Sequence, residues 1–234
     1  MAAERLPGKP LLEINNLPII SHVVKRGQET NLGEVIVCTE DEEILNEVKK
    51  NGGKAIMTGT HHKNGTERIY EALQKLKKNE TEFVISLQGD EPDINPNDIK
   101  NLFNFMVSKD SDIGTLASEI QNNSELKNKN VVKVETKEKL KENNFISALN
   151  FSRNDLSINS RYVYHHIGIY CYKVSILEKF VGLKQTENEI KFKLEQLRAI
   201  DNNININVAL GKTSIGVDTR EDYLALKKIM EYKS

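Results

Sequence analysis

Short apolar strands alternate with amphipathic helices through the first half of this 234-residue chain. The apolar spacing predicts strands over Glu34–Thr39, Lys54–Thr58 and Glu82–Leu87, and helices over Asp41–Lys50, Thr66–Leu76 and Pro96–Ser108. Short connections between such elements favour a parallel sheet covered by helices on both faces. We therefore expect an α/β fold.

The second half of the chain is richer in strands. We expect strands over Asp112–Ala117, Val131–Thr136, Phe145–Phe151, Arg161–Tyr172 and near Ile204–Val208, a long helix over Thr186–Ile200 and a last helix from Arg220 to about Tyr232. The whole pattern favours a single domain over residues 1–234. Its core would comprise about residues 1–110 and 200–234, and a β-rich insertion with the long helix would fill about residues 111–200.

Composition excludes several classes of protein. With 33 Lys and Arg against 34 Asp and Glu, the formal net charge is -1, which argues against a protein that coats nucleic acid. No apolar run approaches the ~20 residues needed to cross a bilayer, and the first residues lack the apolar core of a secretory signal. Cys38 and Cys171 lie in apolar runs and form no CxxC pair, as expected of free thiols in a reducing compartment. We expect a cytoplasmic protein with no nucleic-acid or membrane partner, acting on small molecules.

Familiar catalytic motifs are absent from the sequence. It contains no HExxH, GxGxxG or GxxxxGK[ST], so zinc hydrolases, Rossmann dehydrogenases and P-loop kinases are disfavoured. The turn RLPGKP instead places two cations, Arg5 and Lys9, around Gly8. Both could converge on one phosphate, and Gly8 would let backbone N–H groups approach it. The alternative is an ordinary surface turn with solvated cations.

Two acidic segments follow predicted strands or precede a helix. Asp90, in QGDEP, follows a predicted strand, where open α/β sheets bind ligands, and a carboxylate there suits Mg²⁺. In GVDT, Thr219 and Asp222 have the spacing of a helix cap, which leaves Asp218 as a second metal ligand or an acid beside the helix. The alternatives are an acidic turn after a strand and an ordinary capped helix.

Two further segments carry side chains suited to binding. Asn64 has the position of a helix cap, and Arg68 on the first turn of that helix could add charge for an anion. The alternative is an ordinary capped helix with a solvated arginine. Alternation in HHIGIY places His166 and Tyr170 on one face, where they could hydrogen-bond a polyhydroxylated ligand or pack in the core.

The order of these motifs resembles that of one known family. RLPGKPL, HKNGTER, LQGDEP, NVVKV, NFSR, HHIGIY, LEQLR and GVDTREDY resemble, in this order, the 3-deoxy-manno-octulosonate (Kdo) cytidylyltransferases, or CMP-Kdo synthetases. The resemblance runs from Arg5 to the last helix, and LQGDEP, LEQLR and GVDT are its most specific parts. Acylneuraminate cytidylyltransferases share the RLPGKP-like start, but QGDEP and the pairing of HIGIY with LEQLR fit the Kdo branch better.

The resemblance implies a fold and a reaction. The fold is a three-layer α/β/α sandwich of the nucleotidyltransferase type (nucleotide-diphospho-sugar transferases), usually a homodimer in the cytoplasm of bacteria with an outer membrane. The reaction joins CTP and Kdo into CMP-Kdo and pyrophosphate, requires Mg²⁺ and feeds lipopolysaccharide assembly.

The resemblance also implies roles for individual residues. Arg5 and Lys9 would hold the CTP phosphates and, with Asp90 and Asp218 as Mg²⁺ ligands, form the catalytic set. Arg68 and Asp90 join Arg5 and Lys9 in the nucleotide site. The sugar site would be lined by Gln88, Arg153, His166, Tyr170, Glu195 and Gln196.

Departures from the family pattern keep alternatives open. Family members have an apolar strand and a Pro-Ala-Arg turn before RLPGKP, whereas four residues precede Arg5 here. We expect that this first central strand is missing, that the 234-residue chain is poorly stable and inactive, and that about 12 upstream residues would restore activity. His165 replaces a frequent arginine, so 8-amino-Kdo or a sialic-type acid is an alternative sugar. An inactive form that only binds nucleotide is another alternative.

Overall fold

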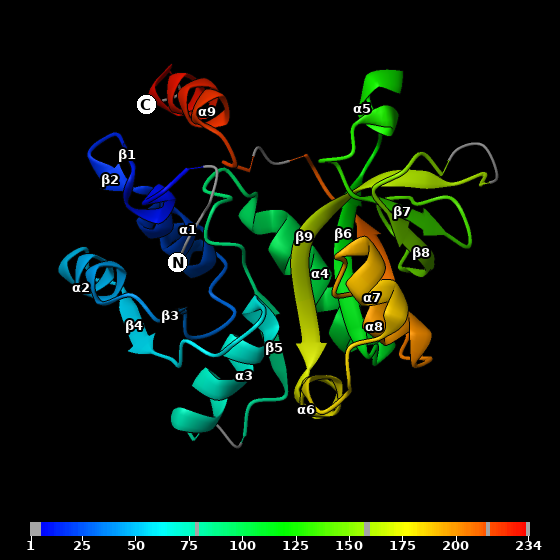
Figure 1. Ribbon diagram of the computed structural model, residues 1–234, viewed down its shortest axis with the longest axis horizontal. Coiled ribbons are helices and arrows are strands. Elements are labelled where there is room, and N and C mark those ends of the chain that lie inside the picture. The colour runs from blue at the N-terminus through cyan, green and yellow to red at the C-terminus, as the bar shows by residue number, and fades with distance from the viewer. Residues whose placement is uncertain (1–5, 78–79, 157–159, 214–215, 233–234) are drawn as a thin grey trace. The chain divides into compact units, whose positions relative to one another are not determined.

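The computed structural model describes residues 6–77, 80–156, 160–213 and 216–232. These residues form two compact units, and most of their elements are labelled in Figure 1. The first unit contains residues 6–77, 87–100 and 216–232, and the second contains residues 80–86, 101–156 and 160–213. None of the described helices is long and apolar enough to cross a membrane.

The first unit joins the predicted strand–helix alternation to the last helix of the chain. Its elements are η1 (Lys9–Leu11), β1 (Glu13–Ile14), β2 (Leu17–Pro18), α1 (Ile19–Glu29), β3 (Ile36–Thr39), α2 (Glu42–Lys50), β4 (Lys54–Met57), α3 (Gly65–Lys75), the start of α4 (Pro96–Lys109) and α9 (Arg220–Tyr232). Strands β3 and β4 pair in parallel, as predicted. The cap that Asn64 was predicted to supply is present, because its side chain accepts a hydrogen bond from the Glu67 amide.

Two apolar clusters hold the first unit together. One contains Ile14 and Ile19 with Leu226 and Met230 of α9, so the last helix packs on the first segments of the chain. The other joins α1 to α2, with Val48 at its centre. Burial of these side chains holds the segment from Leu6 to Ile19 and helix α9 in one unit.

The second unit is built around a six-stranded sheet. Its elements are β5 (Phe83–Ser86), the rest of α4, β6 (Ile113–Ser118), α5 (Asn123–Lys127), β7 (Lys133–Thr136), β8 (Ile146–Ser152), β9 (Val163–Lys173), α6 (Val174–Val181), α7 (Glu187–Phe192), α8 (Leu197–Asp201) and β10 (Ile206–Leu210). The strand order is β5-β9-β6-β10-β8-β7, and β7 also pairs with β9. Only β6 and β10 pair in parallel among these described strands.

The prediction of one parallel sheet is therefore only partly correct. β5 pairs antiparallel with β9, while β3 and β4 form a separate two-stranded sheet among the described residues. The reason is the position of β9, the long yellow-green strand of Figure 1. Its last residues pair with β5 on one side and with β6 on the other, so β9 separates these two strands.

The predicted long helix over Thr186–Ile200 is wrong. The structure has α7 and α8 instead, with Lys193 between them in the left-handed conformation (φ 52°). The break is required by Arg198, whose guanidinium donates two hydrogen bonds to the Glu189 carboxylate. Nine residues of continuous helix would separate these two residues by about 13 Å along the axis.

Helices lie against both faces of the sheet in the second unit. On one face, α4 approaches Gly114 so closely that a Cβ there would lie 2.6 Å from Met106 Sδ and 2.9 Å from Leu102 Cδ1. The neighbouring pair of residues, Ile113 and Tyr172, points to the other face. There the Tyr172 ring lies 6.3 Å from that of Phe180 in α6.

Candidate active site

Three segments far apart in the sequence meet at the ammonium group of Lys9 in the first unit. Lys9 Nζ donates to Asp90 Oδ2 at 2.6 Å and to Asp218 Oδ1 at 3.4 Å. The two carboxylates lie 81 and 209 residues away in the sequence. Lys9 is only 9% exposed, which rules out the alternative of a solvated cation. The structure thus brings together three of the four residues of the expected catalytic set, and the fourth, Arg5, lies outside the described residues.

Local backbone geometry explains how each group is held. Gly8 adopts the left-handed conformation (φ 69°) directly before η1, which a residue with a Cβ would do only with strain. The Val217 amide donates to the Asp90 carbonyl at 2.9 Å and ties the two acidic segments together. The predicted cap of α9 is also present, because Asp222 accepts from the amides of Asp218 and Thr219 and donates its own amide to the Thr219 hydroxyl.

This arrangement suits a divalent cation in chemical terms. Asp90 and Asp218 offer oxygen ligands of the kind that Mg²⁺ prefers. The Lys9 ammonium between them shows that both carboxylates can share one positive charge. Two carboxylates that close to one point would repel each other without a cation. The residues present therefore fit the predicted metal.

Arg68 is buried. The alternative interpretation, an ordinary capped helix with a solvated arginine, is therefore wrong. The Arg68 guanidinium donates to Glu40 Oε2 at 2.6 Å, to the Thr58 hydroxyl at 2.7 Å and to the Gly59 carbonyl at 3.1 Å. The hydrogen bond from Arg68 lowers the pKa of Glu40. The place of Arg68 in a nucleotide site stays a prediction. Gln88, which was predicted for the sugar site, is exposed two residues before Asp90.

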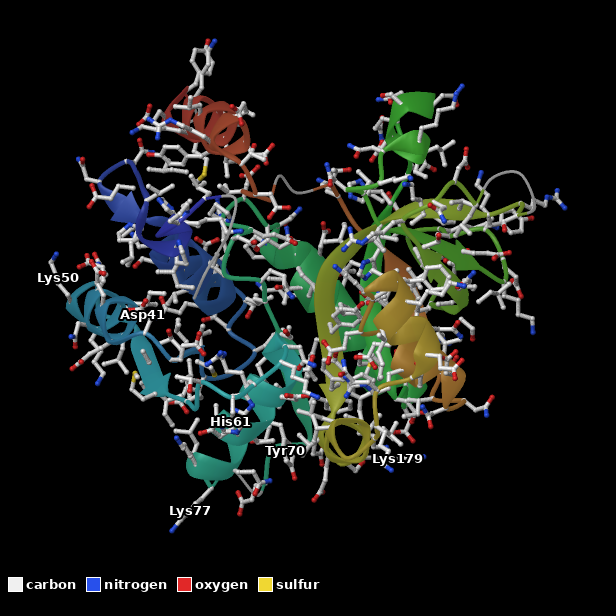
Figure 2. The ribbon with its side chains drawn as sticks, viewed as in Figure 1. Asp41, Lys50, His61, Tyr70, Lys77 and Lys179 are labelled. Atoms are coloured by element: carbon white, nitrogen blue, oxygen red, sulfur yellow. The ribbon has the colours of Figure 1, made fainter. Side chains whose placement is uncertain are left out.

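A cluster that the sequence analysis did not single out lies between β4 and α3, near the His61 label of Figure 2. His61, His62 and Glu71 offer ligand atoms within 4.8 Å of one another. The Glu71 carboxylate already accepts from the Gly59 amide, from His62 and from the Lys75 ammonium. The hydrogen bonds from Lys75, His62 and Gly59 lower the pKa of Glu71 to about 2. This satisfied network needs no metal ion to neutralise its carboxylate.

In the second unit, His166 and Tyr170 lie together, as alternation predicted. Their ring centroids are 5.4 Å apart, and His166 Nε2 lies 3.0 Å from the Thr115 hydroxyl. The register of β6 and β9 shifts at Thr115, whose hydroxyl also donates to the carbonyls of Ile167 and Ile169. Burial lowers the pKa of His166 to about 3, so its imidazole is neutral at pH 7. The buried Tyr170 hydroxyl has no hydrogen-bond partner among the described residues.

Glu195 and Gln196 lie in the turn between α7 and α8, and their carbonyls accept hydrogen bonds from Arg198 and Ala199. Burial, together with the nearby Tyr172 and Glu195, raises the pKa of Tyr170 well above its usual value. Glu195 therefore lies close enough to Tyr170 to influence its ionisation. These observations place two more of the predicted sugar residues, and their binding role stays a prediction.

Arg153 follows directly after β8. Its Nη1 donates to the carbonyls of Lys129 and Asn130, both at 3.4 Å, so the guanidinium rests on the loop before β7. Its partly exposed position suits a predicted contact with an acidic ligand.

Two buried cations were not assigned a role from the sequence. Arg198, the last residue of LEQLR, is 1% exposed, pairs with Glu189 and lies 4.8 Å from the Phe180 ring centroid. Lys133, in NVVKV, is completely buried. The signal was available, because both lie inside motifs that carried the family resemblance. Charged residues are rarely buried unless they are paired, so the burial of these two cations could be recognised only from their partners in the structure.

Comparison with known proteins identifies the family. The cytidylyltransferase family pattern matches residues 1–206. A 3-deoxy-manno-octulosonate cytidylyltransferase from Afipia carboxidovorans is 41% identical over 98% of this chain and 93% of its own length. Another, from Thermodesulfovibrio yellowstonii, is also 41% identical, over 97% of this chain and 93% of its own length.

Solved structures agree with the sequence relatives. CMP:2-keto-3-deoxy-manno-octonic acid synthetase in complex with CTP superposes with a TM-score of 0.88 at 34% identity, covering 98% of this chain and 94% of that protein. Apo UDP-glucose pyrophosphorylase, at 13% identity and a TM-score of 0.71, shows the same mixed α/β nucleotidyltransferase-like fold. By sequence and by structure, the chain belongs to the cytidylyltransferase family and, within it, to the 3-deoxy-manno-octulosonate cytidylyltransferases.

Proposed function

We propose that this chain transfers the cytidylyl group of CTP to Kdo and releases pyrophosphate. The observation that carries the proposal is the meeting of Lys9, Asp90 and Asp218 at one point of the first unit. CTP and an acid sugar are both anions, so a site that joins them must neutralise both. The relatives named above and the CTP complex of a related synthetase support this choice of substrates.

The reaction makes one bond at phosphorus and breaks another. The anomeric oxygen of Kdo bonds to the α-phosphorus of CTP, the bond from that phosphorus to the β-bridging oxygen breaks, and pyrophosphate leaves with the electron pair. The hydroxyl proton goes to solvent. Lys9, together with Arg5, would stabilise the negative charge that grows on the leaving group. Most of the acceleration would come from positioning and electrostatics, without a covalent intermediate.

We place Mg²⁺ on Asp90 and Asp218, because these carboxylates already share one cation. A bound Mg²⁺ would act as a Lewis acid toward the phosphate oxygens. Lys9 would then exchange its carboxylate partners for phosphate oxygens. Arg68, oriented by Glu40, would add positive charge to the nucleotide site.

We assign the sugar site to the six residues that the family resemblance implies. The Arg153 guanidinium would bind the Kdo carboxylate through its two-pronged donor geometry. The neutral His166 and the Tyr170 hydroxyl would bind sugar hydroxyls. A buried hydroxyl without a hydrogen-bond partner in the protein is suited to form a hydrogen bond with a ligand. Gln88, Glu195 and Gln196 would complete this site.

The finer features implied by the family stay part of the proposal. Helices on both faces of the second unit's sheet support a three-layer sandwich. We also keep one domain with a β-rich insertion as part of the proposal. We also propose a homodimer in the cytoplasm whose product feeds lipopolysaccharide assembly. We propose an active enzyme because Lys9, Asp90 and Asp218 meet in one site. The expectation of an inactive chain stays an untested prediction, and turnover by the purified chain would overturn it.

A panel of acceptor sugars tests the proposal. The purified chain is incubated with CTP, Mg²⁺ and either Kdo, 8-amino-Kdo or N-acetylneuraminate, and pyrophosphate release is followed. We expect the fastest release with Kdo. If the enzyme prefers one of the other sugars, that sugar and not Kdo is the substrate. Thermal stabilisation by CTP and Mg²⁺ without release with any sugar would instead identify a nucleotide binder.

A further inference from the structure

The Lys133 side chain is a buried charge with an unusual set of partners. Lys133 begins β7 and is 0% exposed. Its ammonium donates to the carbonyls of Asn128 at 2.6 Å, Val131 at 3.0 Å and Arg153 at 2.9 Å. An ammonium has three protons, so these three oxygens satisfy it completely. All three of these partners are backbone carbonyls, while the nearby Asp155 and Glu125 favour the charged form of the ammonium.

Burial of this charge is unfavourable by itself. Desolvation lowers the pKa of Lys133, since water no longer surrounds its charged form. An apolar side chain at this position would avoid that penalty but would remove the ammonium donor from all three carbonyls, of which that of Asn128 also accepts from the Val131 amide. The ammonium therefore holds together two backbone segments that are separate in sequence, the 128–131 loop and the residue after β8.

The same loop also supports Arg153. The carbonyls of Lys129 and Asn130 accept from the Arg153 guanidinium, between the two loop carbonyls that accept from Lys133. The next carbonyl, that of Val132, accepts from the His166 amide at 2.9 Å. Five consecutive carbonyls thus bind one buried cation and two residues expected at the sugar site.

We propose that Lys133 is a positioning residue for acceptor binding. It fixes the backbone at Arg153 and shapes the loop that carries the Arg153 guanidinium, so that the guanidinium is held ready for the carboxylate of the acid sugar. This inference rests on the proposed function, and it assigns Lys133 no contact with the substrate.

The first test separates acceptor binding from nucleotide binding. Lys133→Met keeps an unbranched side chain that is one atom shorter and removes all three donors. We expect it to raise KM for Kdo by about tenfold or more, as misplacement of a binding group does, while KM for CTP stays unchanged. Lys133→Arg keeps the charge but cannot aim three donors at converging oxygens, and we expect an intermediate effect. Lys173→Met, at a partly exposed lysine of the same sheet, is the control and should leave both values unchanged.

A second readout reports on the carboxylate itself. Wild-type protein should prefer Kdo over its C1 amide, and Arg153→Gln should lose most of that preference. We expect Lys133→Met to lose it to a similar degree, and the double variant to lose little more than Arg153→Gln alone. A lower kcat with similar changes in both KM values and an intact preference for the carboxylate would mean that Lys133 is only structural. This result would overturn the inference.

A measurement on wild-type protein covers the case in which Lys133→Met does not fold. The side-chain ¹⁵Nζ resonance of Lys133, assigned through its side-chain carbons, should be protected from solvent and should shift on addition of Kdo but not of CTP. A resonance that Kdo leaves unmoved at saturation would contradict the inference. Absence of turnover in the wild type would instead contradict the proposed function, so the two failures are distinguishable.

Discussion

The ammonium of Lys9 lies 2.6 Å from Oδ2 of Asp90, a residue that follows it by 81 positions in the sequence. The same ammonium reaches Asp218, directly before the last helix of the chain. A single positive charge therefore links η1, the segment after β5 and the turn before α9. This relationship is the physical basis of the proposed nucleotide and metal site.

Loss of the Lys9 charge should slow the reaction strongly. We expect Lys9→Met to lower kcat by about 10²–10³-fold, the usual effect of removing one group that stabilises a transition-state charge. Steady-state pyrophosphate release measures this. Lys50→Met is the matched control, because this lysine of the same unit is largely exposed. If Lys9→Met turned over within about twofold of the wild-type rate, far less than the loss expected for such a group, Lys9 would not belong to the catalytic set.

Neutralising either carboxylate should abolish turnover without unfolding the protein. Asp90→Asn and Asp218→Asn keep the shape of the side chain but lose the charge that a divalent cation needs. We expect no detectable pyrophosphate release and a thermal unfolding transition close to that of wild type. Asp110→Asn, at an exposed aspartate, should remain fully active. An active Asp218→Asn would leave Asp218 as part of the α9 cap alone.

Lys9 should compete with a divalent cation for the same carboxylates. Without nucleotide, Mn²⁺ binding followed by electron paramagnetic resonance should be tighter in Lys9→Met than in wild type, since the two carboxylates then lack their internal cation. Asp90→Asn should bind Mn²⁺ at least about tenfold more weakly, as expected when one charged ligand is lost. Weaker Mn²⁺ binding in Lys9→Met would show that the ammonium and the metal do not share this position.

The pair formed by Glu189 and Arg198 should dominate the stability of the α7–α8 region. Both side chains are buried. Burial alone would raise the pKa of Glu189, but the hydrogen bonds from Arg198 and Gln185 outweigh this effect, so that the pKa is lowered overall. We expect Arg198→Met to lower the free energy of unfolding by about 3–5 kcal/mol, because it leaves a buried carboxylate without its partner. Urea unfolding measures this. Glu189→Met combined with Arg198→Met should recover much of the loss, and an unchanged midpoint in the single variant would contradict the account.

His166 should make the protein less stable in mild acid. Its pKa is about 3 in the folded protein, below the value of about 6.5 in an unfolded chain. Between these values the unfolded state binds more protons, so stability rises with pH, by up to about 1.4 kcal/mol per pH unit from this residue. Chemical unfolding at several pH values should show a smaller slope between pH 4 and 6 for His166→Gln. An identical slope would mean that His166 titrates normally in the folded state.

Local features of the fold could be predicted from the sequence. The caps at Asn64 and Thr219 depend on side chains within four residues, and their spacing was sufficient to predict them. The strands of the second half were also predicted to within about two residues, since apolar runs mark them. Helix α1, in contrast, was not predicted, although Ile19, Ile20, Val23 and Val24 form its buried face.

Non-local features could not be predicted in this way. The insertion of β9 beside β5 depends on pairing across nearly 90 residues, which periodicity does not encode. The division of the expected long helix depends on the contact between Glu189 and Arg198. The convergence on Lys9 was expected through family resemblance, whereas the burial of Lys133 and Arg68 emerged only from their three-dimensional partners.

The most direct test of the account is ³¹P NMR of the purified chain with CTP, Mg²⁺ and Kdo, run beside Asp90→Asn. We predict that wild-type protein consumes CTP and produces CMP-Kdo and pyrophosphate in equal amounts, while Asp90→Asn leaves CTP intact. CTP that persists with wild-type protein, or equal product formation by Asp90→Asn, would contradict it.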